Sequence, residues 1–211
     1  MPRVRKLHDG YFHQAKREGY VARSAYKLLE INEKKKLVRK GDWVLDLGCA
    51  PGSWLQAAAE LVGPKGRVVG IDLKPVDHPM PENVRTLVGD LTTTDPSLLT
   101  DTVCGRFKVV ISDMAPNTTG AGDDFRSVRL CRAILERLPG LIAPKGNLTM
   151  KVFEGAEMPE LVAETRALFT EAGQFKPRAS REVSRETYVF AKGYRGPVTM
   201  PESADPAEPG A

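Results

Sequence analysis

The chain has 211 residues, 41% of them hydrophobic and 27% charged, which is typical of one globular domain. No apolar stretch approaches the roughly 20 residues that cross a bilayer, so a membrane-spanning protein is excluded. The three cysteines lie far apart, and none has metal-ligand spacing with another cysteine or with a histidine. This pattern argues against a disulfide framework and a structural zinc site, and it favours a cytoplasmic protein that needs no metal.

Positive charge is concentrated at the start of the chain. Residues 1–40 contain 12 Lys/Arg and 4 Asp/Glu, a balance of +8, so the rest of the chain carries −4 of the total +4. A basic segment of this kind indicates a polyanionic partner, of which nucleic acid is the commonest. A solvated helix with lysines on its exposed face is an equally good interpretation of the charge alone.

Short apolar runs rich in Val and Ile recur after residue 40 and predict buried strands. They cover residues 43–47, 67–72, 84–88, 107–113, 147–153 and 187–192. Between them, residues 53–61, 124–138 and 158–172 have helical spacing, and a leading helix is predicted over residues 22–36. Glycines that follow the three later helices are predicted to cap them, namely Gly63, Gly140 and Gly173.

Alternating strands and helices predict an α/β fold with a doubly wound, mostly parallel sheet and helices on both faces. We divide the chain into a basic N-terminal segment with its leading helix (1–40), a main domain (41–195) and a disordered tail (196–211). Ligands of such sheets bind at the carboxyl ends of the strands. The residues that follow the strands are therefore the candidates for chemistry.

The first strand runs into a glycine-containing turn, Asp46–Trp54, in which Gly52 lets the backbone approach a ligand. The G-x-G-x-x-G spacing of dinucleotide folds is absent, which argues against a nicotinamide-dependent dehydrogenase. A ligand without phosphate, such as a sulfonium amino acid, needs only a looser loop. Asp72 and Asp90 end the next two strands. There Asp72 could accept hydrogen bonds from ribose hydroxyls, and Asp90 could hold an adenine amino group. Each aspartate alone could equally be a turn or helix cap.

A lysine, Lys151, lies in a strand that otherwise reads as buried, and buried lysines are rare unless they are paired. Asp113 ends the neighbouring strand, Glu186 begins the last one, and Lys27 lies in the leading helix. Two lysines and two carboxylates around one cleft suit the activation of a hydroxyl nucleophile. An ordinary buried ion pair, with Lys27 facing solvent, is the alternative.

Taken together, these motifs resemble the RrmJ/FtsJ ribose 2′-O-methyltransferases over roughly residues 11–194. The resemblance rests on Arg23–Leu28, Asp46–Trp54, Asp72, Gly89–Asp90, Ser112–Asn117, Lys151–Gly155 and Ser184–Val189. It implies a Rossmann-like fold with a seven-stranded sheet, S-adenosylmethionine as methyl donor, and a catalytic tetrad of Lys27, Asp113, Lys151 and Glu186. It also implies cofactor contacts at Gly52, Trp54, Asp72, Asp90 and Asp113. Ser53 departs from the second glycine that many members have.

The resemblance further implies that the substrate is a uridine of 23S rRNA in the large ribosomal subunit, with Lys151 as proton acceptor. The turn after Asp113 reads Met-Ala-Pro and lacks the aromatic residue of base-amine methylases, which disfavours that reaction. A tRNA ribose methyltransferase and a non-catalytic assembly factor remain alternatives, and we expect a monomer. The residues predicted to contact RNA phosphates are Arg23, Lys34, Lys35, Lys36, Arg39 and Lys40.

Overall fold

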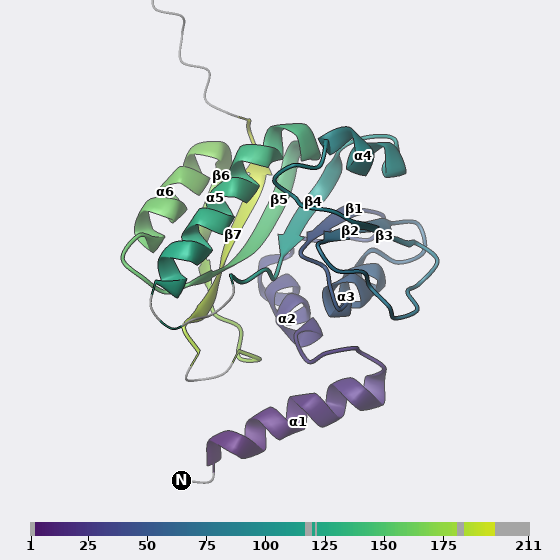
Figure 1. Ribbon diagram of the computed structural model, residues 1–211, viewed down its shortest axis with the longest axis vertical. Coiled ribbons are helices and arrows are strands. Elements are labelled where there is room, and N and C mark those ends of the chain that lie inside the picture. Colours follow the sequence, from purple (N-terminus) through teal and green to yellow (C-terminus); the bar gives the residue numbers. More distant parts are fainter. Residues whose placement is uncertain (1–2, 117–119, 121, 181–183, 197–211) are drawn as a thin grey trace, which may run out of the picture.

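Seven strands form one sheet in the order β3-β2-β1-β4-β5-β7-β6 (Figure 1). The computed structural model of the protein describes residues 3–116, 120, 122–180 and 184–196. The strands are β1 (Trp43–Leu47), β2 (Arg67–Asp72), β3 (Val84–Val88), β4 (Phe107–Ser112), β5 (Ile142–Phe153), β6 (Phe169–Phe175) and β7 (Glu186–Tyr194). All neighbouring strands pair in parallel except at β7, which is antiparallel to both β5 and β6. The predicted mostly parallel α/β sheet is therefore confirmed.

Helices cover both faces of the sheet, as Figure 1 shows. Their bounds are α1 (Arg3–Glu18), α2 (Ala25–Lys35), α3 (Ser53–Val62), α4 (Pro96–Thr100), α5 (Asp123–Leu141) and α6 (Met158–Leu168), with a 3₁₀ turn at Asp101–Val103. Buried residues of α2 and α3 pack on one face, and those of α4, α5 and α6 pack on the other. Among the described residues no helix is long and apolar enough to cross a membrane.

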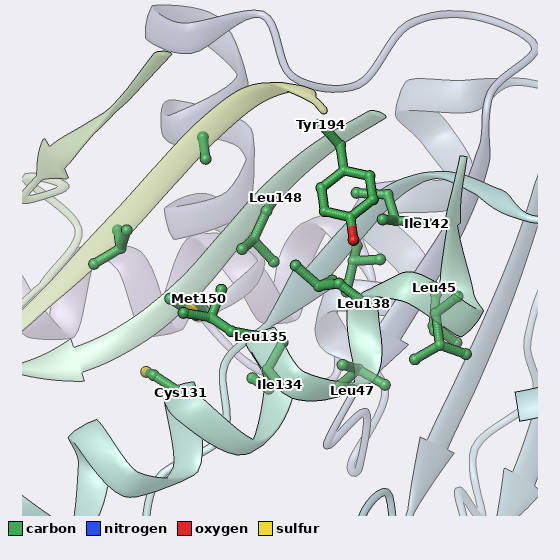
Figure 2. Close-up of a cluster of buried hydrophobic side chains, with 14 of the residues drawn as sticks. Leu45, Leu47, Cys131, Ile134, Leu135, Leu138, Ile142, Leu148, Met150 and Tyr194 are labelled. Atoms are coloured by element: carbon green, nitrogen blue, oxygen red, sulfur yellow. The ribbon is translucent and has the colours of Figure 1, made fainter. Parts of the chain in front are cut away.

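The larger core lies between the sheet and α5 (Figure 2). Ile134 and Leu138 project from α5 onto Leu45 of β1 and Leu148 of β5, and all four side chains are buried. Near-continuous apolar strands of this kind are expected where helices cover both faces. This packing fixes the carboxyl ends of β1, β4 and β5 relative to one another.

The predicted helix over residues 158–172 is wrong at its end. It stops at Leu168, and Phe169–Phe175 forms the edge strand β6, which pairs with β7. Phe169 and Ala172 are buried at a spacing of three that also fits a helix, so the pattern did not distinguish the two structures. Pairing with β7 decides the conformation, and Gly173 lies within the strand instead of capping a helix.

The helix α5 extends further than predicted, through Pro139 and Gly140 to Leu141, and β5 begins directly at Ile142. Gly140 is therefore not a helix cap. Pro139 lies in the last turn of the helix. The prediction for Gly63 is confirmed, because it ends α3 with φ of 66° and donates its N–H to Ala59 O.

Candidate active site

Charged side chains meet at the edge of the sheet where the parallel strands end. Asp46 and Asp72 lie at the ends of β1 and β2, Asp113 follows β4, and Lys151 lies near the end of β5. A cavity of about 690 Å³ opens at this edge and is lined by Asp72, Asp90 and Asp113. This is the position at which doubly wound sheets bind their ligands.

The loop after β1 is shaped by glycines that approach other chain segments closely. Gly48 has φ of 76°, and a Cβ there would lie 1.9 Å from Cγ of Met114. Gly52 has φ of 112°, and a Cβ there would lie 2.5 Å from Cε of Met80. Any side chain at either position would distort the loop, so the glycines keep the cavity open.

Asp72 and Asp90 point their carboxylates along the wall of this cavity. Asp72 accepts hydrogen bonds from the backbone N–H groups of Ala50 and Lys74, both at 2.9 Å. Asp90 accepts from the N–H and the hydroxyl of Thr92, which lowers the pKa of its carboxyl. Both aspartates thus make the turn contacts that were the alternative interpretation, while still lining the cavity.

Two lysine–carboxylate pairs lie beside the cavity. Lys151 Nζ is 3.1 Å from Asp113 Oδ1 and also donates to the backbone carbonyl of Asp113. Lys27 Nζ is 2.9 Å from Glu186 Oε2. Both lysine side chains are only 8% exposed. The alternative of a solvent-facing Lys27 is therefore wrong.

The two pairs act on each other electrostatically. Burial alone would raise the pKa of Glu186, but the charge and hydrogen bond of Lys27, together with the charge of Lys151, hold the pKa below its usual value. Glu186 is therefore ionised at neutral pH. The four residues form one charged cluster that joins α2, β5, β7 and the end of β4.

A tyrosine that the sequence interpretation missed completes this cluster. Tyr188 lies directly opposite Lys151 in the β5–β7 ladder, and its hydroxyl donates to Asp113 Oδ1 at 2.6 Å. Its ring stacks on Trp54 at 5.7 Å between centroids, with 25° between the planes. The available signal was its spacing of two from Glu186, which puts both side chains on one face of the strand.

The sequence of this chain is similar to those of known methyltransferases. The sequence model of FtsJ-like methyltransferases matches residues 20–194. A protein from Desulforapulum autotrophicum named "Ribosomal RNA large subunit methyltransferase E" is 46% identical, covering 91% of this chain and 95% of that protein. Its counterpart from Syntrophobacter fumaroxidans, with the same name, is 44% identical, covering 90% and 97%.

The chain belongs to the FtsJ-like methyltransferase family. Solved structures agree with this assignment. A ribosomal RNA methyltransferase from Plasmodium falciparum superposes with a TM-score of 0.73 and 28% identity, covering 84% of this chain and 100% of that one. Fibrillarin from Aeropyrum pernix, solved with bound S-adenosyl-L-methionine, shares the fold at a TM-score of 0.56 and 15% identity, covering 78% and 71%.

For a member of this family, the acidic floor of the cavity, formed by Asp72, Asp90 and Asp113, fits a cationic methyl donor. Asp46 is fully buried, and neither of its carboxyl oxygens has a hydrogen-bond partner within the described residues. Burial, followed by the charges of Asp113 and Asp72, raises its pKa well above the ordinary value. The carboxylates that line the cavity, those of Asp72, Asp90 and Asp113, favour a sulfonium ligand over an anionic one. The buried position of Asp46 within an apolar strand was the signal in the sequence.

Two of the residues predicted to contact the cofactor in this methyltransferase do not line the cavity. Trp54 is 2% exposed, and its indole N–H donates to the carbonyl of Ser24 at 2.9 Å. Gly52 contributes no lining atom either, although it shapes the loop. Ser53, which departs from the family pattern, shares a 2.6 Å hydrogen bond between its hydroxyl and that of Ser24. Asn117, the last residue of the predicted turn after Asp113, lies outside the described residues.

The structure separates the residues predicted to contact RNA. Arg23 lies just before α2, at the end that carries Lys27, whereas the other five lie at or beyond the opposite end of α2. Lys35 Nζ lies 4.1 Å from the ring centroid of Phe190, and Lys40 donates to the carbonyl of Glu60. The remaining three are exposed, namely Lys34, Lys36 and Arg39.

Metal-ligating side chains do not gather in the described part of the chain. No group of three or more His, Cys, Asp or Glu residues there could hold a metal ion.

Proposed function

We propose that this FtsJ-like methyltransferase methylates a ribose 2′-hydroxyl of RNA, and that its substrate is a uridine of 23S rRNA in the large ribosomal subunit. The observation that carries this proposal is the Lys151–Asp113 pair beside a cavity with an acidic floor. A hydroxyl is a weak nucleophile, so it needs a group that can accept or steer its proton.

The cavity residues would hold S-adenosylmethionine, which supplies an activated methyl group when bound. Asp72 would accept hydrogen bonds from its ribose hydroxyls and Asp90 from its adenine amino group. Asp113 would border the end of the cavity at which the methyl group is transferred. Gly52 and Trp54 would contribute through the backbone and packing of their loop. The loop lacks the G-x-G-x-x-G spacing of dinucleotide folds, in agreement with a donor that has no phosphate.

The chain's own groups would orient the 2′-hydroxyl and take up its proton. Lys151, as a neutral amine, would accept the proton, while Asp113 holds its Nζ in place and the Tyr188 hydroxyl in turn holds Asp113 by donating to Oδ1. Lys27 and Glu186 would hold the substrate ribose in position, and their opposite charges would balance each other. Most of the rate enhancement would come from positioning, since the methyl donor is already a good electrophile.

RNA is the substrate that this chemistry requires, because DNA lacks the 2′-hydroxyl. The relatives named as large-subunit rRNA methyltransferases cover most of this chain, which favours 23S rRNA over tRNA. The complete set of paired lysines and carboxylates argues against a non-catalytic assembly factor.

We further propose that the protein acts as a monomer in the cytoplasm. Arg23 would contact an RNA phosphate near Lys27, and the exposed Lys34, Lys36 and Arg39 would make more distant phosphate contacts.

Mapping of 2′-O-methyl groups tests this proposal. Total RNA from cells with and without the protein would be compared at each nucleotide of 23S rRNA and of the tRNAs. We expect one uridine of 23S rRNA to lose its 2′-O-methyl group. Loss at a tRNA position would favour the tRNA alternative, and no loss anywhere would contradict the proposed reaction.

A further inference from the structure

The amino ends of the strands carry a second cluster of charge, which differs in kind from that of the active site. Parallel strands begin at one edge of the sheet, so residues far apart in the sequence come together there. We call this cluster the amino-edge surface. It consists of six exposed cations, Lys36, Arg39, Lys65, Arg67, Arg106 and Lys145.

Contacts between neighbouring segments connect the parts of the chain that carry these cations along the edge. Arg67 pairs in register with Trp43 at the start of β1, next to the segment that carries Arg39. A cavity of about 370 Å³ is lined by three cations, Lys65, Arg67 and Arg85 of β3, and by one acid, Glu82. Further along, Lys108 of β4 reaches the carbonyl of Pro144, the residue before Lys145.

The side chains of the six cations form no ion pair with an acid among the described residues, although Glu33 interacts electrostatically with Lys36 and Glu82 lines the cavity beside Lys65 and Arg67. Within the described residues none of their side chains makes a hydrogen bond or an ion pair. The nearest acid to Arg39 in sequence, Asp42, uses its carboxylate to accept the backbone N–H of Arg39. At the active-site edge, by contrast, both buried lysines are paired. An excess of exposed cations along one edge attracts an extended anion.

Phosphate backbone fits this surface better than an acidic protein does. Protein interfaces have cores enriched in aromatic and apolar side chains. Of the large hydrophobic residues that are exposed in the described part of the chain, only Leu98 lies on an element next to this surface, because α4 runs into the turn that lines the cavity. The others are Phe12, Leu73, Val88 and Phe125. Contacts to nucleic-acid backbone need only Lys and Arg, independent of base sequence.

The amino-edge surface is too far from the active site to touch the reacting nucleotide. β4 has six residues, and strands rise by about 3.3 Å per residue, so the two edges lie roughly 20 Å apart. That is about the width of a nucleic-acid duplex. An RNA held at this edge must therefore be a different segment from the one that enters the active site.

We propose that the amino-edge surface binds the phosphate backbone of a second RNA segment of the substrate, remote from the methylated ribose. This inference rests on the proposed function, because it requires a substrate as large as ribosomal RNA. The surface raises the affinity for that substrate and contributes nothing to the chemical step.

The test is the double variant Lys65→Gln/Arg67→Gln, compared with Ala163→Glu/Ala167→Glu on the exposed side of α6. Both double variants change the net charge by the same amount, and all four side chains are exposed. Steady-state methyl transfer would be measured on large ribosomal subunits from cells lacking the protein, at several KCl concentrations. Binding of a 20-base-pair RNA duplex would be measured in parallel by fluorescence anisotropy.

For Lys65→Gln/Arg67→Gln we expect KM for the subunits to rise about fivefold with kcat unchanged. The slope of log affinity for the duplex against log salt should decrease by about 1.5, since two phosphate contacts are lost. The α6 variant should match the wild type. Wild-type KM and duplex affinity in Lys65→Gln/Arg67→Gln, or equal losses in both variants, would overturn the inference. If the wild type methylates no subunits, the proposed function fails instead, and duplex binding alone decides the role of the surface.

Discussion

The two edges of the sheet use positive charge in different ways. At the carboxyl edge, Lys27 and Lys151 are nearly buried, and each lies within about 3 Å of a carboxylate. At the amino edge, cations such as Lys65 and Arg67 are exposed and have no ion-pair partner among the described residues. Pairing holds a charge in one position for chemistry, whereas unpaired exposed charge acts over distance and is screened by salt.

This difference predicts that substitutions at the two edges change different kinetic constants. Changes at the carboxyl edge should act on kcat, because they disturb groups that surround the reacting atoms. Changes at the amino edge should act on KM and on its salt dependence.

The largest effect is expected for Lys151→Ala. Removal of the proposed proton acceptor should lower kcat by about 10³-fold, which is within the usual range for general-base catalysis. The affinity for S-adenosylhomocysteine, measured by calorimetry, should stay within about twofold because the cavity walls are unchanged. If Lys151→Ala retained a tenth of the wild-type kcat, the lysine would be only a steering charge.

Glu186→Gln should have a smaller effect on kcat, about tenfold, because Lys27 keeps a neutral hydrogen-bond partner but loses its counter-charge. Stability provides a second measurement. The lowered pKa of Glu186 means that its ionised form stabilises the fold above the unfolded value of 4.5, and this contribution is lost as pH falls. Between pH 7 and pH 4 the variant should lose less unfolding free energy than the wild type. Equal losses would show that the Lys27–Glu186 pair does not stabilise the fold.

Tyr188→Phe tests whether Asp113 must be held in place. The variant keeps the ring stacked on Trp54 and removes only the hydroxyl that donates to Asp113. Asp113 is still held by Lys151, so only part of the roughly 1.5–3 kcal/mol of a hydrogen bond to a charged group should reach the chemical step, and kcat should fall about threefold. KM for S-adenosylmethionine should change little. A purely structural role would instead lower the melting temperature and leave kcat intact.

The smallest effect is expected for Asp46→Asn and concerns stability. Because burial and neighbouring carboxylates raise the pKa of Asp46, the folded protein holds this proton above pH 3.8, where the unfolded chain releases it. Folding stability therefore falls as pH rises through that range, and Asn removes this dependence. Unfolding by urea should show the variant gaining stability relative to the wild type between pH 4 and pH 7. A constant difference across that range would contradict the assignment.

The central part of the fold could be predicted from the sequence because its strands are short apolar runs with acids at their ends. Asp72 and Asp113 are such acids, and Lys151 stands out as a cation within an apolar strand. The edge strand β6 was not, because Phe169 and Ala172 satisfy helical spacing and only pairing with β7 excludes a helix. Local patterns carry no information on such pairing.

Residues whose role depends on contacts between distant parts of the sequence could not be predicted either. Tyr188 reads as a core residue until the ladder places it beside Lys151 and Asp113. The amino-edge cations are separated by up to 109 positions along the chain, from Lys36 to Lys145, and only the parallel sheet brings them to one edge. Basic residues in the first 40 positions were noticed because they are clustered in sequence.

The most direct test of the proposed reaction is the identity of its product. Purified protein would be incubated with methyl-labelled S-adenosylmethionine and large ribosomal subunits that lack its modification, and the rRNA would then be digested to nucleosides. We predict label in a single 2′-O-methyluridine for the wild type and none for Lys151→Ala. Label in a methylated base, or equal label with Lys151→Ala, would contradict methyl transfer to a ribose hydroxyl by this lysine–aspartate pair.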